Sequence, residues 1–411
     1  LQGHMDMVCA QTEDCPKDMT REGLDLATDG RYVWAEKTSL GGDDCIAVAA
    51  AFAILADDSL SHPPLEVVIT VDEETGMDGA VALDCSDLKG RRLLNLDSEE
   101  EGVFTVSCAG GLRADCFVPA VKEPLTDEAC FAVSIGGLKG GHSGAEIDKG
   151  RGSGNDLISR VLYSAMERLG TLRIADLRGG QFDNVICTRC DAVVAVPAGR
   201  AEDFAAFIRE FDGILKNEYA ATDGGVTLTC AAADADAAYS AEDSSRLLHV
   251  LLTLPQGVEV MSADFPGLVQ TSLNLGVMTA CGDGLHFSFS IRSSVATQKE
   301  LLLQRVRAIV EYTGGGTVST RGDYPAWQYA RQSPLRDTVM ASYKQITGQD
   351  GVIMATHGGL ECGLLINKMP GLDAVSLGPE LHDIHSPRER LGVDSVKRMY
   401  ALVCEVLKNC R

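Results

Sequence analysis

The 411-residue sequence is poor in basic side chains and contains no long hydrophobic run. It has 36 Lys and Arg against 59 Asp and Glu, which gives a net charge of −23. Nucleic-acid-binding proteins present a basic face, so this balance argues against that class. The longest apolar run, from Ile46 to Ala56, has the length of a buried helix and is too short to span a membrane. We therefore expect no nucleic-acid partner and no membrane partner.

The sequence also lacks a nucleotide-binding motif and a paired cysteine motif. It opens on Leu1 in an expected strand, so we interpret it as missing its natural N-terminus. The 14 cysteines follow no repeating spacing, and the one Cys-x-x-Cys, at 187–190, has no second pair at zinc-ribbon distance. Reduced thiols in a cytoplasmic protein fit this pattern. The glycine-rich run at 136–144 lacks Gly-x-Gly-x-x-Gly spacing and instead presents His142.

Hydrophobic periodicity predicts an α/β protein with two domains. The chain is longer than one hydrophobic core usually serves, and apolar strands alternate with helices along it. After about residue 110 the character changes to that of an α+β segment. We expect one domain made of residues 1–110 and 324–411 and an inserted α+β domain made of residues 111–323.

Residues 1–8 are predicted to form a strand that carries His4 and Asp6. Side chains at positions i and i+2 lie on the same face of a strand, so an imidazole lies beside a carboxylate. Such a carboxylate fixes the tautomer and the basicity of a metal-bound histidine. A solvated aspartate and a histidine bonded to backbone would explain the same pair, and the pair alone favours that simpler interpretation.

Further acids follow two predicted strands. Glu73 and Glu74 come after the apolar strand at 65–71, and Asp97 closes the strand at 91–96. In open α/β sheets, ligands bind outside the carboxyl ends of the strands. Glu73 and Glu74 point to different sides, so one can bind a cation while the other faces a substrate. An exposed acidic turn is the alternative.

Asp43 and Asp44 precede a helix predicted over 45–57, which is apolar nearly all round and therefore expected to be buried. Capping of the helix N-terminus accounts for one of these acids. A second adjacent acid is harder to explain by capping. Together with His4 and the acids after the strands, they form the mixed histidine and carboxylate set that suits Zn or Mn, whereas Ca takes oxygen ligands alone.

Two histidines follow the last predicted core strand, at 374–378. His382 and His385 would share a face if this segment were helical, but Pro387 and a preceding Gly-Pro indicate a loop. We therefore expect only one of the two to bind a metal.

In this order, these residues resemble the M20 family of zinc peptidases, and within it the group of aminoacyl-histidine dipeptidases. Six runs that span essentially the whole chain carry the likeness: LQGHMDMV, EETGMDGA, DSEEEG, GLKGGHSG, GLECG and HSP. The resemblance implies a homodimeric, cytoplasmic dipeptidase that binds two Zn²⁺ ions, with Mn²⁺ or Co²⁺ as substitutes. Its substrates would be short peptides such as Xaa-His. The resemblance also implies that residues 1–110 and 324–411 form a catalytic domain with a mixed sheet, and that residues 111–323 form an inserted lid or dimerisation domain.

The resemblance also implies roles for individual residues. Five would bind metal: His4 and Asp97 one ion, Glu74 and His385 the other, and Asp43 both. Asp6 would orient His4, and Glu73 would be the general base that takes a proton from the attacking water. The peptide bond after the bridging acid is often cis in this family. Where relatives carry Asp-Asn, this chain has Asp43-Asp44.

Four further residues match substrate-binding positions of the family: His142, Asn184, Arg292 and Gly359. In dimeric relatives the histidine comes from the partner subunit. Arg292 is permanently charged and fork-shaped, which suits the free carboxylate of a dipeptide. His357 belongs to the resemblance without an assigned role. Another M20 hydrolase, such as a tripeptidase or an N-acyl-amino-acid amidohydrolase, and a non-catalytic metal-binding homologue are the alternatives.

Overall fold

The structure is a computed structural model that describes residues 1–410. The chain divides into two compact units. Unit 1 combines Leu1–Cys108 with Pro325–Arg411, and unit 2 is Ala109–Tyr324. The sequence prediction places its domain limits at 110–111 and 323–324.

Unit 1 is built on a six-stranded mixed sheet, in the order β18-β6-β19-β5-β1-β4. Its strands are β1 (Gln2–His4), β4 (Val68–Thr70), β5 (Arg92–Asn95), β6 (Val103–Cys108), β18 (Val352–Thr356) and β19 (Asp373–Ser376). Strand β1 runs parallel to β4 and β5, so these strands end at the same edge of the sheet. The strand predicted over 1–8 is shorter than expected, because its partner β4 ends at Thr70, opposite His4.

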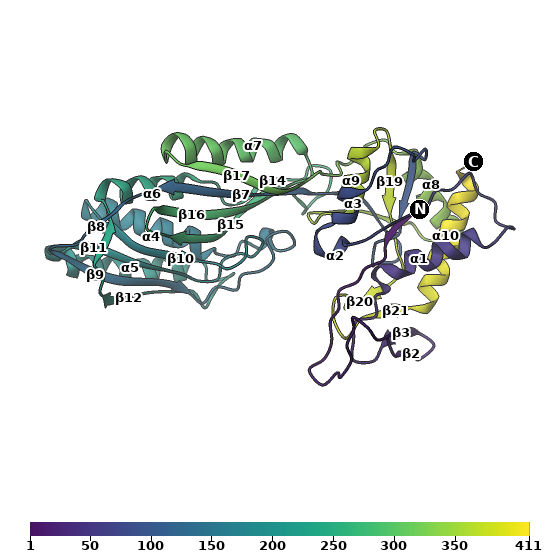
Figure 1. Ribbon diagram of the computed structural model, residues 1–411, viewed down its shortest axis with the longest axis horizontal. Helices are drawn as coiled ribbons and strands as arrows, with labels where there is room; N and C mark the ends of the chain where they lie inside the picture. The colour runs from purple at the N-terminus through teal and green to yellow at the C-terminus, as the bar shows by residue number, and fades with distance from the viewer. Residues whose placement is uncertain (411) are drawn as a thin grey trace. The chain divides into compact units, whose positions relative to one another are not determined.

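Helices cover both faces of this sheet (Figure 1). They are α1 (Gly42–Leu55), α2 (Glu73–Gly76), α3 (Asp78–Ala82), α8 (Pro334–Thr347), α9 (Glu361–Lys368) and α10 (Val393–Asn409). The core combines apolar side chains of α1, α8 and α10 with those of the strands, among them Ile54, Leu94, Val339 and Val403. Ser333 caps α8 by accepting a hydrogen bond from the backbone N–H of Arg336.

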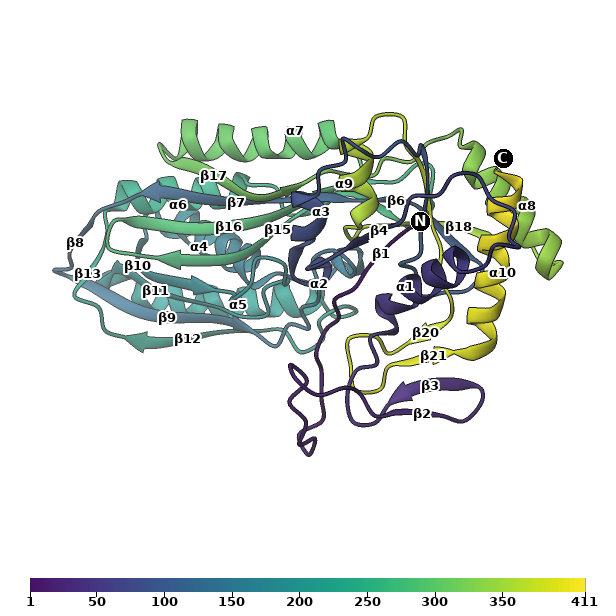
Figure 2. The ribbon, with the colours of Figure 1, turned by 45° about the vertical axis from the view of Figure 1, so that its right-hand side comes forward.

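A small antiparallel sheet joins early and late segments of unit 1 (Figure 2). It contains β2 (Leu26–Thr28), β3 (Tyr32–Ala35), β20 (Leu381–His382) and β21 (Arg390–Gly392). Strand β21 pairs with β3, so the loop between β20 and β21, which carries His385, is fixed to the first part of the chain.

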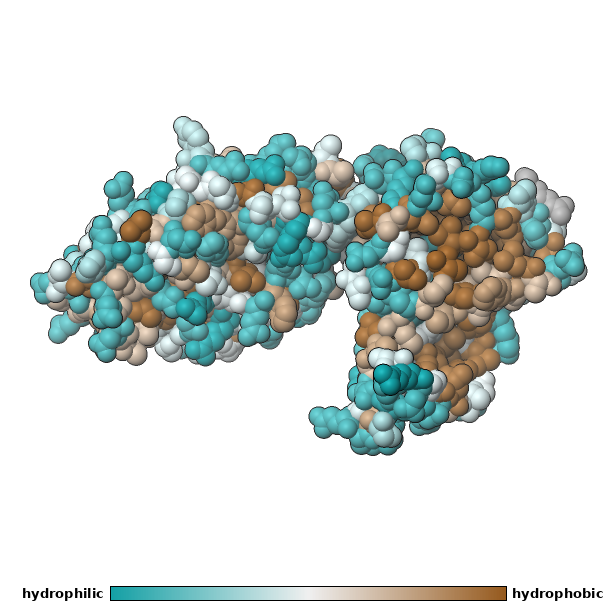
Figure 3. Space-filling model, in the orientation of Figure 1, coloured by the Kyte–Doolittle hydropathy of each residue, from teal (hydrophilic) through white to brown (hydrophobic). Residues whose placement is uncertain are grey.

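The prediction that the first helix is buried all round is wrong. Figure 3 shows apolar residues gathered on the visible face of unit 1. In helix α1, Phe52 is 69% exposed and Leu55 is 53% exposed. Its other side packs in the core through Ala47, Ala51 and Ile54. Composition alone could not show this, because an apolar helix carries no pattern that marks the side its neighbours cover.

Unit 2 is an antiparallel nine-stranded sheet, in the order β12-β9-β11-β10-β15-β16-β7-β17, with β14 beside β15. Its strands are β7 (Gly110–Pro119), β9 (Glu128–Gly136), β10 (Arg173–Gly179), β11 (Cys190–Pro197), β12 (Thr227–Ala233), β14 (Gly257–Met261), β15 (Val269–Ala280), β16 (Gly284–Ser293) and β17 (Thr317–Tyr324). A separate pair is formed by β8 (Lys122–Pro124) and β13 (Ala237–Tyr239).

The helices of unit 2 share one large hydrophobic core with this sheet. They are α4 (Gly154–Leu169), α5 (Ala201–Glu218), α6 (Ala241–Thr253) and α7 (Ala296–Arg307), with short turns η1 (Ile147–Lys149), η2 (Ala198–Arg200) and the π-helical η3 (Ala308–Thr313). The α+β character expected for this segment is present. Within residues 1–410, no helix combines the length and the apolar character that a membrane crossing needs.

Candidate active site

Strand β1 and the start of α1 approach each other closely because Gly3 has no side chain. A Cβ at this position would lie 2.3 Å from Asp44 Oδ2 and 2.4 Å from Ala47 Cβ. The Asp44 carboxylate accepts a hydrogen bond from the backbone N–H of His4 at 3.2 Å. The Asp43-Asp44 peptide bond is cis, as the family resemblance implies. The N-cap residue of α1 is Gly41, and both aspartates lie in the first turn, where the helix dipole favours carboxylates.

Asp43 places one carboxylate oxygen toward each of two histidines. Its Oδ1 lies 3.2 Å from His4 Nε2, and its Oδ2 lies 3.1 Å from His385 Nε2. Asp97 Oδ1 is 3.5 Å from His4 Nε2, and Glu74 Oε2 is 3.0 Å from His385 Nε2. The five residues thus form two groups that share Asp43. Within each group the possible ligand atoms lie no more than 4.8 Å apart.

Each group offers one imidazole and two carboxylates, a donor set that fits Zn or Mn. Burial raises the pKa of Asp97 to about 7 and also raises the pKa of Glu74. Burial works against a charged His4, yet hydrogen bonds to Asp43 and Asp97 raise its pKa to about 12. Glu74 Oε1 is buried and has no hydrogen-bond partner among residues 1–410. Several carboxylates this close together repel one another unless positive charge lies between them. The residues therefore fit a pair of divalent cations.

Glu73 precedes Glu74 at the start of α2 but belongs to neither group. Burial raises the pKa of the Glu73 carboxyl to about 8, and the negative charge of Asp97 adds to the effect. A carboxyl group with a pKa near neutrality, close to two cation-binding groups but outside both, is suited to accept and donate protons.

Asp6 connects β1 to the turn that carries Glu74. Its Oδ2 accepts a hydrogen bond from the backbone N–H of Glu74 at 3.2 Å. The backbone carbonyl of Asp6 lies 3.0 Å from His4 Nδ1, and its Oδ1 lies 3.5 Å from the same nitrogen. Because Nδ1 faces these acceptors, Nε2 is the nitrogen of His4 that points toward Asp43 and Asp97.

Among the residues described, His385 belongs to a group that could hold a metal ion and His382 does not. His382 Nε2 instead lies 2.7 Å from Glu380 Oε1, and its ring packs edge-on against Tyr32. Gly359 lies in the loop between β18 and α9. His357 in the same loop is buried.

Sequence reasoning missed Glu389, which is only 2% exposed. Its carboxylate accepts backbone N–H groups of four successive residues, those of Leu40 at 2.8 Å, Gly41 at 3.1 Å, Gly42 at 2.8 Å and Asp43 at 3.4 Å. It lies in the same loop as His385, so one buried side chain fixes the segment that presents Asp43 to the segment that presents His385. The only sequence signal is its position shortly after the HSP run.

We expect Glu389→Gln to lower the free energy of unfolding by about 3 kcal/mol, because an amide leaves some of these buried N–H groups without an acceptor. Urea denaturation of the cation-loaded protein measures the change. Glu380→Gln is the matched control, since its partly exposed carboxylate is paired with the partly exposed His382. Equal stability of the two variants would contradict the role assigned to Glu389.

Sequence reasoning also missed a buried network beneath the site. Glu361 Oε2 accepts hydrogen bonds from Gln2 Nε2 at 2.5 Å and from Thr70 Oγ1 at 2.7 Å. Gln2 Oε1 in turn accepts a bond from Asn95 Nδ2 at 2.6 Å. Side chains from β1, β4, β5 and α9 are thereby connected, which holds together the strands that carry the site residues.

Unit 2 brings His142, Asn184 and Arg292 into one neighbourhood. The backbone carbonyl of Asn184 accepts the N–H of Ser143 at 2.8 Å, next to His142. A Cβ on Gly144 would lie 2.9 Å from His142 Cε1 and 3.4 Å from Arg292 Cζ. Burial lowers the pKa of His142, and the charge of Arg292 lowers it further, which favours the neutral imidazole.

The hydrogen bonds around His142 select one tautomer. The backbone N–H groups of Gly144 and Ala145 both donate to its Nδ1, each at 3.2 Å. The proton of the neutral ring therefore resides on Nε2, which is a donor suited to a carbonyl oxygen. Arg292 is 7% exposed and donates from Nη1 to the Tyr324 hydroxyl at 3.1 Å, while its Nε has no hydrogen-bond partner among the residues described.

Residues 1–409 match the profile of peptidase family M20/M25/M40. The chain belongs to this family. It is 36% identical over 410 residues to the cytosol non-specific dipeptidase of Escherichia coli strain K12, a match that covers 99% of this chain and 84% of that protein. The crystal structure of aminoacylhistidine dipeptidase from Vibrio alginolyticus superposes with a TM-score of 0.92 at 33% identity, covering 99% and 83% of the two chains.

The fold of the family extends to more distant members. Aminopeptidase PepT from Bacillus cereus matches with a TM-score of 0.52 at 16% identity, over 99% of this chain and 79% of that one. At this identity the likeness concerns the fold alone. The predictions of an M20 α/β fold and of an M20-type peptide hydrolase are confirmed by the family match and the two full-length relatives.

Proposed function

We propose that this M20 peptidase is a dinuclear metal-dependent dipeptidase that hydrolyses short peptides such as Xaa-His. The observation that carries the proposal is the shared Asp43 carboxylate, with one oxygen beside each of two histidine-containing groups. His4 and Asp97 would hold one cation, and Glu74 and His385 the other. Zn²⁺ is the first candidate, and Mn²⁺ or Co²⁺ suits the same ligands.

Other residues of unit 1 are proposed to transfer protons and to position the cation-binding side chains. When bound, the cation pair supplies Lewis acidity that activates water and polarises the peptide carbonyl. Glu73 takes a proton from the attacking water on its carboxylate and delivers it to the leaving amine. Asp6 holds His4 and the Glu74 turn in place. Glu389 and the Glu361 network keep the ligand-bearing loops and strands in position.

Residues of unit 2 are proposed to bind the substrate. His142 Nε2–H would donate to the carbonyl oxygen as negative charge develops there. Arg292 would bind the free carboxylate of a dipeptide, and its buried Nε has no hydrogen-bond partner among the residues described. Asn184 and Gly359 are proposed to contact the substrate as well. If turnover requires Arg292 to bind a carboxylate on the second residue of the substrate, the enzyme will be restricted to dipeptides.

A substrate panel run after reconstitution with Zn²⁺, Mn²⁺ or Co²⁺ tests the activity. We expect hydrolysis of β-alanyl-histidine and Ala-Ala and little hydrolysis of an N-acetyl amino acid. A preference for the acetylated compound would instead identify an N-acyl-amino-acid amidohydrolase. Two bound cations with no hydrolysis of any peptide would identify a non-catalytic homologue.

The proposed contact between Arg292 and the free carboxylate of the substrate gives a sharper prediction. We expect the wild-type enzyme to hydrolyse a dipeptide about 10- to 100-fold better than the same dipeptide amide, in kcat/KM, because a charge-assisted hydrogen bond is lost with the carboxylate. In Arg292→Ala the two substrates should become nearly equal, and Arg292→Lys should fall between. An undiminished preference for the free acid in Arg292→Ala would assign the carboxylate to another residue.

We further propose a cytoplasmic homodimer. The E. coli relative is a cytosol dipeptidase, and all 14 cysteines of this chain are free thiols, which fits a reducing compartment. Strand β12 is an edge strand of the unit 2 sheet, a position at which a strand of a second copy can pair. Sedimentation velocity of the purified protein at several concentrations tests the dimer.

A further inference from the structure

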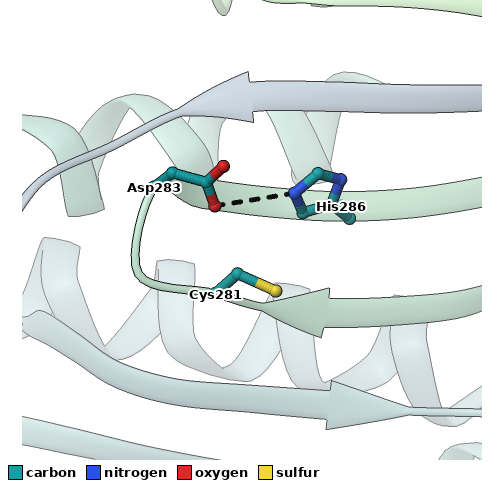
Figure 4. Close-up of side chains that lie close together, drawn as sticks. All are labelled: Cys281, Asp283 and His286. Atoms are coloured by element: carbon teal, nitrogen blue, oxygen red, sulfur yellow. Dashed lines mark ion pairs between the residues drawn. The ribbon is translucent and has the colours of Figure 1, made fainter.

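The hairpin between β15 and β16 carries three side chains that the proposed dipeptidase chemistry does not use. Cys281 and Asp283 lie in its turn, and His286 lies near the start of β16. Their Sγ, carboxylate and imidazole atoms all lie within 4.8 Å of one another. Figure 4 shows Asp283 and His286 facing each other, with Cys281 on the adjoining arm of the hairpin. We propose that these residues form an accessory binding site for a Zn²⁺-class cation.

The backbone of this turn is held from several sides. The N–H of Cys281 donates to the carbonyl of Gly284 at 2.8 Å. The hydroxyl of Tyr239, a fully buried residue, lies 2.6 Å from the Cys281 carbonyl oxygen and 2.7 Å from that of Gly284. The carbonyl of Asp283 accepts the N–H of Ala120 at 3.0 Å. The three side chains therefore project from a fixed backbone, which lowers the entropy cost of closing them on an ion.

The distance between the side chains of Asp283 and His286 fits joint binding of one cation better than a direct hydrogen bond between them. His286 Nε2 and Asp283 Oδ1 are 3.7 Å apart, too far for a hydrogen bond. Oxygen and nitrogen ligands of one tetrahedral Zn²⁺ are separated by about 3.4 Å, as their bond lengths of roughly 2.0–2.2 Å require. The two side chains are 50% and 72% exposed, so a small rotation brings them to that separation.

The ring of His286 is also restrained. It lies against the ring of Phe117 on the neighbouring strand β7, with centroids 4.6 Å apart and planes at 33°. The two residues are direct cross-strand partners. This contact holds the imidazole beside the turn, as the hydrogen bonds of Asp6 hold His4 in unit 1.

The donor atoms define the class of ion. A thiolate, an imidazole and a carboxylate suit Zn²⁺ or Co²⁺, whereas Ca²⁺ and Mg²⁺ take oxygen ligands. Cys281 would release its thiol proton to solvent on binding. Three protein ligands leave the fourth position to water, so we expect weaker binding than at the groups that share Asp43.

A thiolate ligand gives a spectroscopic signal that the two unit 1 groups cannot produce, because those groups contain no sulfur. The full-length protein is first loaded with two equivalents of Zn²⁺ and then titrated with Co²⁺. We expect a third equivalent to bind and to give a thiolate-to-cobalt charge-transfer absorption in the near ultraviolet. Absence of that band in the wild-type protein would overturn the proposal.

Variants of the hairpin residues test whether the charge-transfer band arises from this site. Cys281→Ser should abolish it, and His286→Gln should weaken Co²⁺ binding at least 10-fold. Cys9→Ser, which removes an exposed thiol elsewhere, is the matched control and should leave the band unchanged. Dipeptide hydrolysis by the Zn²⁺-loaded variants should equal that of the wild type, which also shows that they fold. A band that survives Cys281→Ser would place the site at another cysteine and refute the assignment.

Discussion

Replacing Glu73 by alanine is expected to lower kcat about 10³-fold or more while both cations stay bound. General acid–base catalysis by a positioned side chain contributes about 10²- to 10⁴-fold. Glu73 lies outside both ligand groups, and burial raises the pKa of its carboxyl to about 8. Its loss should therefore remove proton transfer and leave metal affinity intact. Steady-state kinetics together with metal analysis after gel filtration measure the two effects separately.

The neighbouring residue supplies the matched control. Glu74→Ala removes the same group from the same turn, but Glu74 lies 3.0 Å from His385 within a metal-binding group. We expect it to lose one cation as well as activity. If Glu73→Ala also lost a cation, Glu73 would be a ligand and the base would have to be sought elsewhere.

Replacing Asp43 by alanine should have the largest effect on metal content. Its two oxygens lie beside His4 and His385, so one substitution removes a ligand from both groups at once. We expect affinity for both cations to fall by more than about 100-fold, which is the most that loss of a supporting partner usually costs. Turnover should become undetectable at cation concentrations that saturate the wild type.

His385→Ala serves as the comparison for Asp43→Ala, since His385 belongs to one group only. Isothermal titration should then show one site weakened and the other retained. If Asp43→Ala weakened only one of the two sites, the carboxylate would not be shared. Circular dichroism of each variant shows whether the fold is retained.

The clustering of His4, Glu74 and Asp97 could be predicted because it follows a rule of topology. Strands β1, β4 and β5 are parallel neighbours, so the residues that follow their ends meet at one edge of the sheet. His4, Glu74 and Asp97 are found there. A pattern of apolar strands that each end in a histidine or an acid is therefore informative before any coordinates are known.

Glu389 could not be found in this way. Its partners are backbone N–H groups 346 to 349 residues earlier in the chain, and backbone groups leave no mark in a sequence. The exposed side of α1 was missed for a related reason. Whether Phe52 is covered depends on which other element lies beside it, and periodicity describes only the helix itself.

The discontinuity of unit 1 has a consequence for how the enzyme is made on the ribosome. Strand β19, at Asp373–Ser376, lies between β5 and β6, which are synthesised some 270 residues earlier. The central sheet therefore cannot close during most of translation, whereas the continuous segment of unit 2 is complete well before. His385 emerges later still. A chain that ends before this residue lacks one member of the group that Asp43, Glu74 and His385 form, so this group is completed only near the end of synthesis.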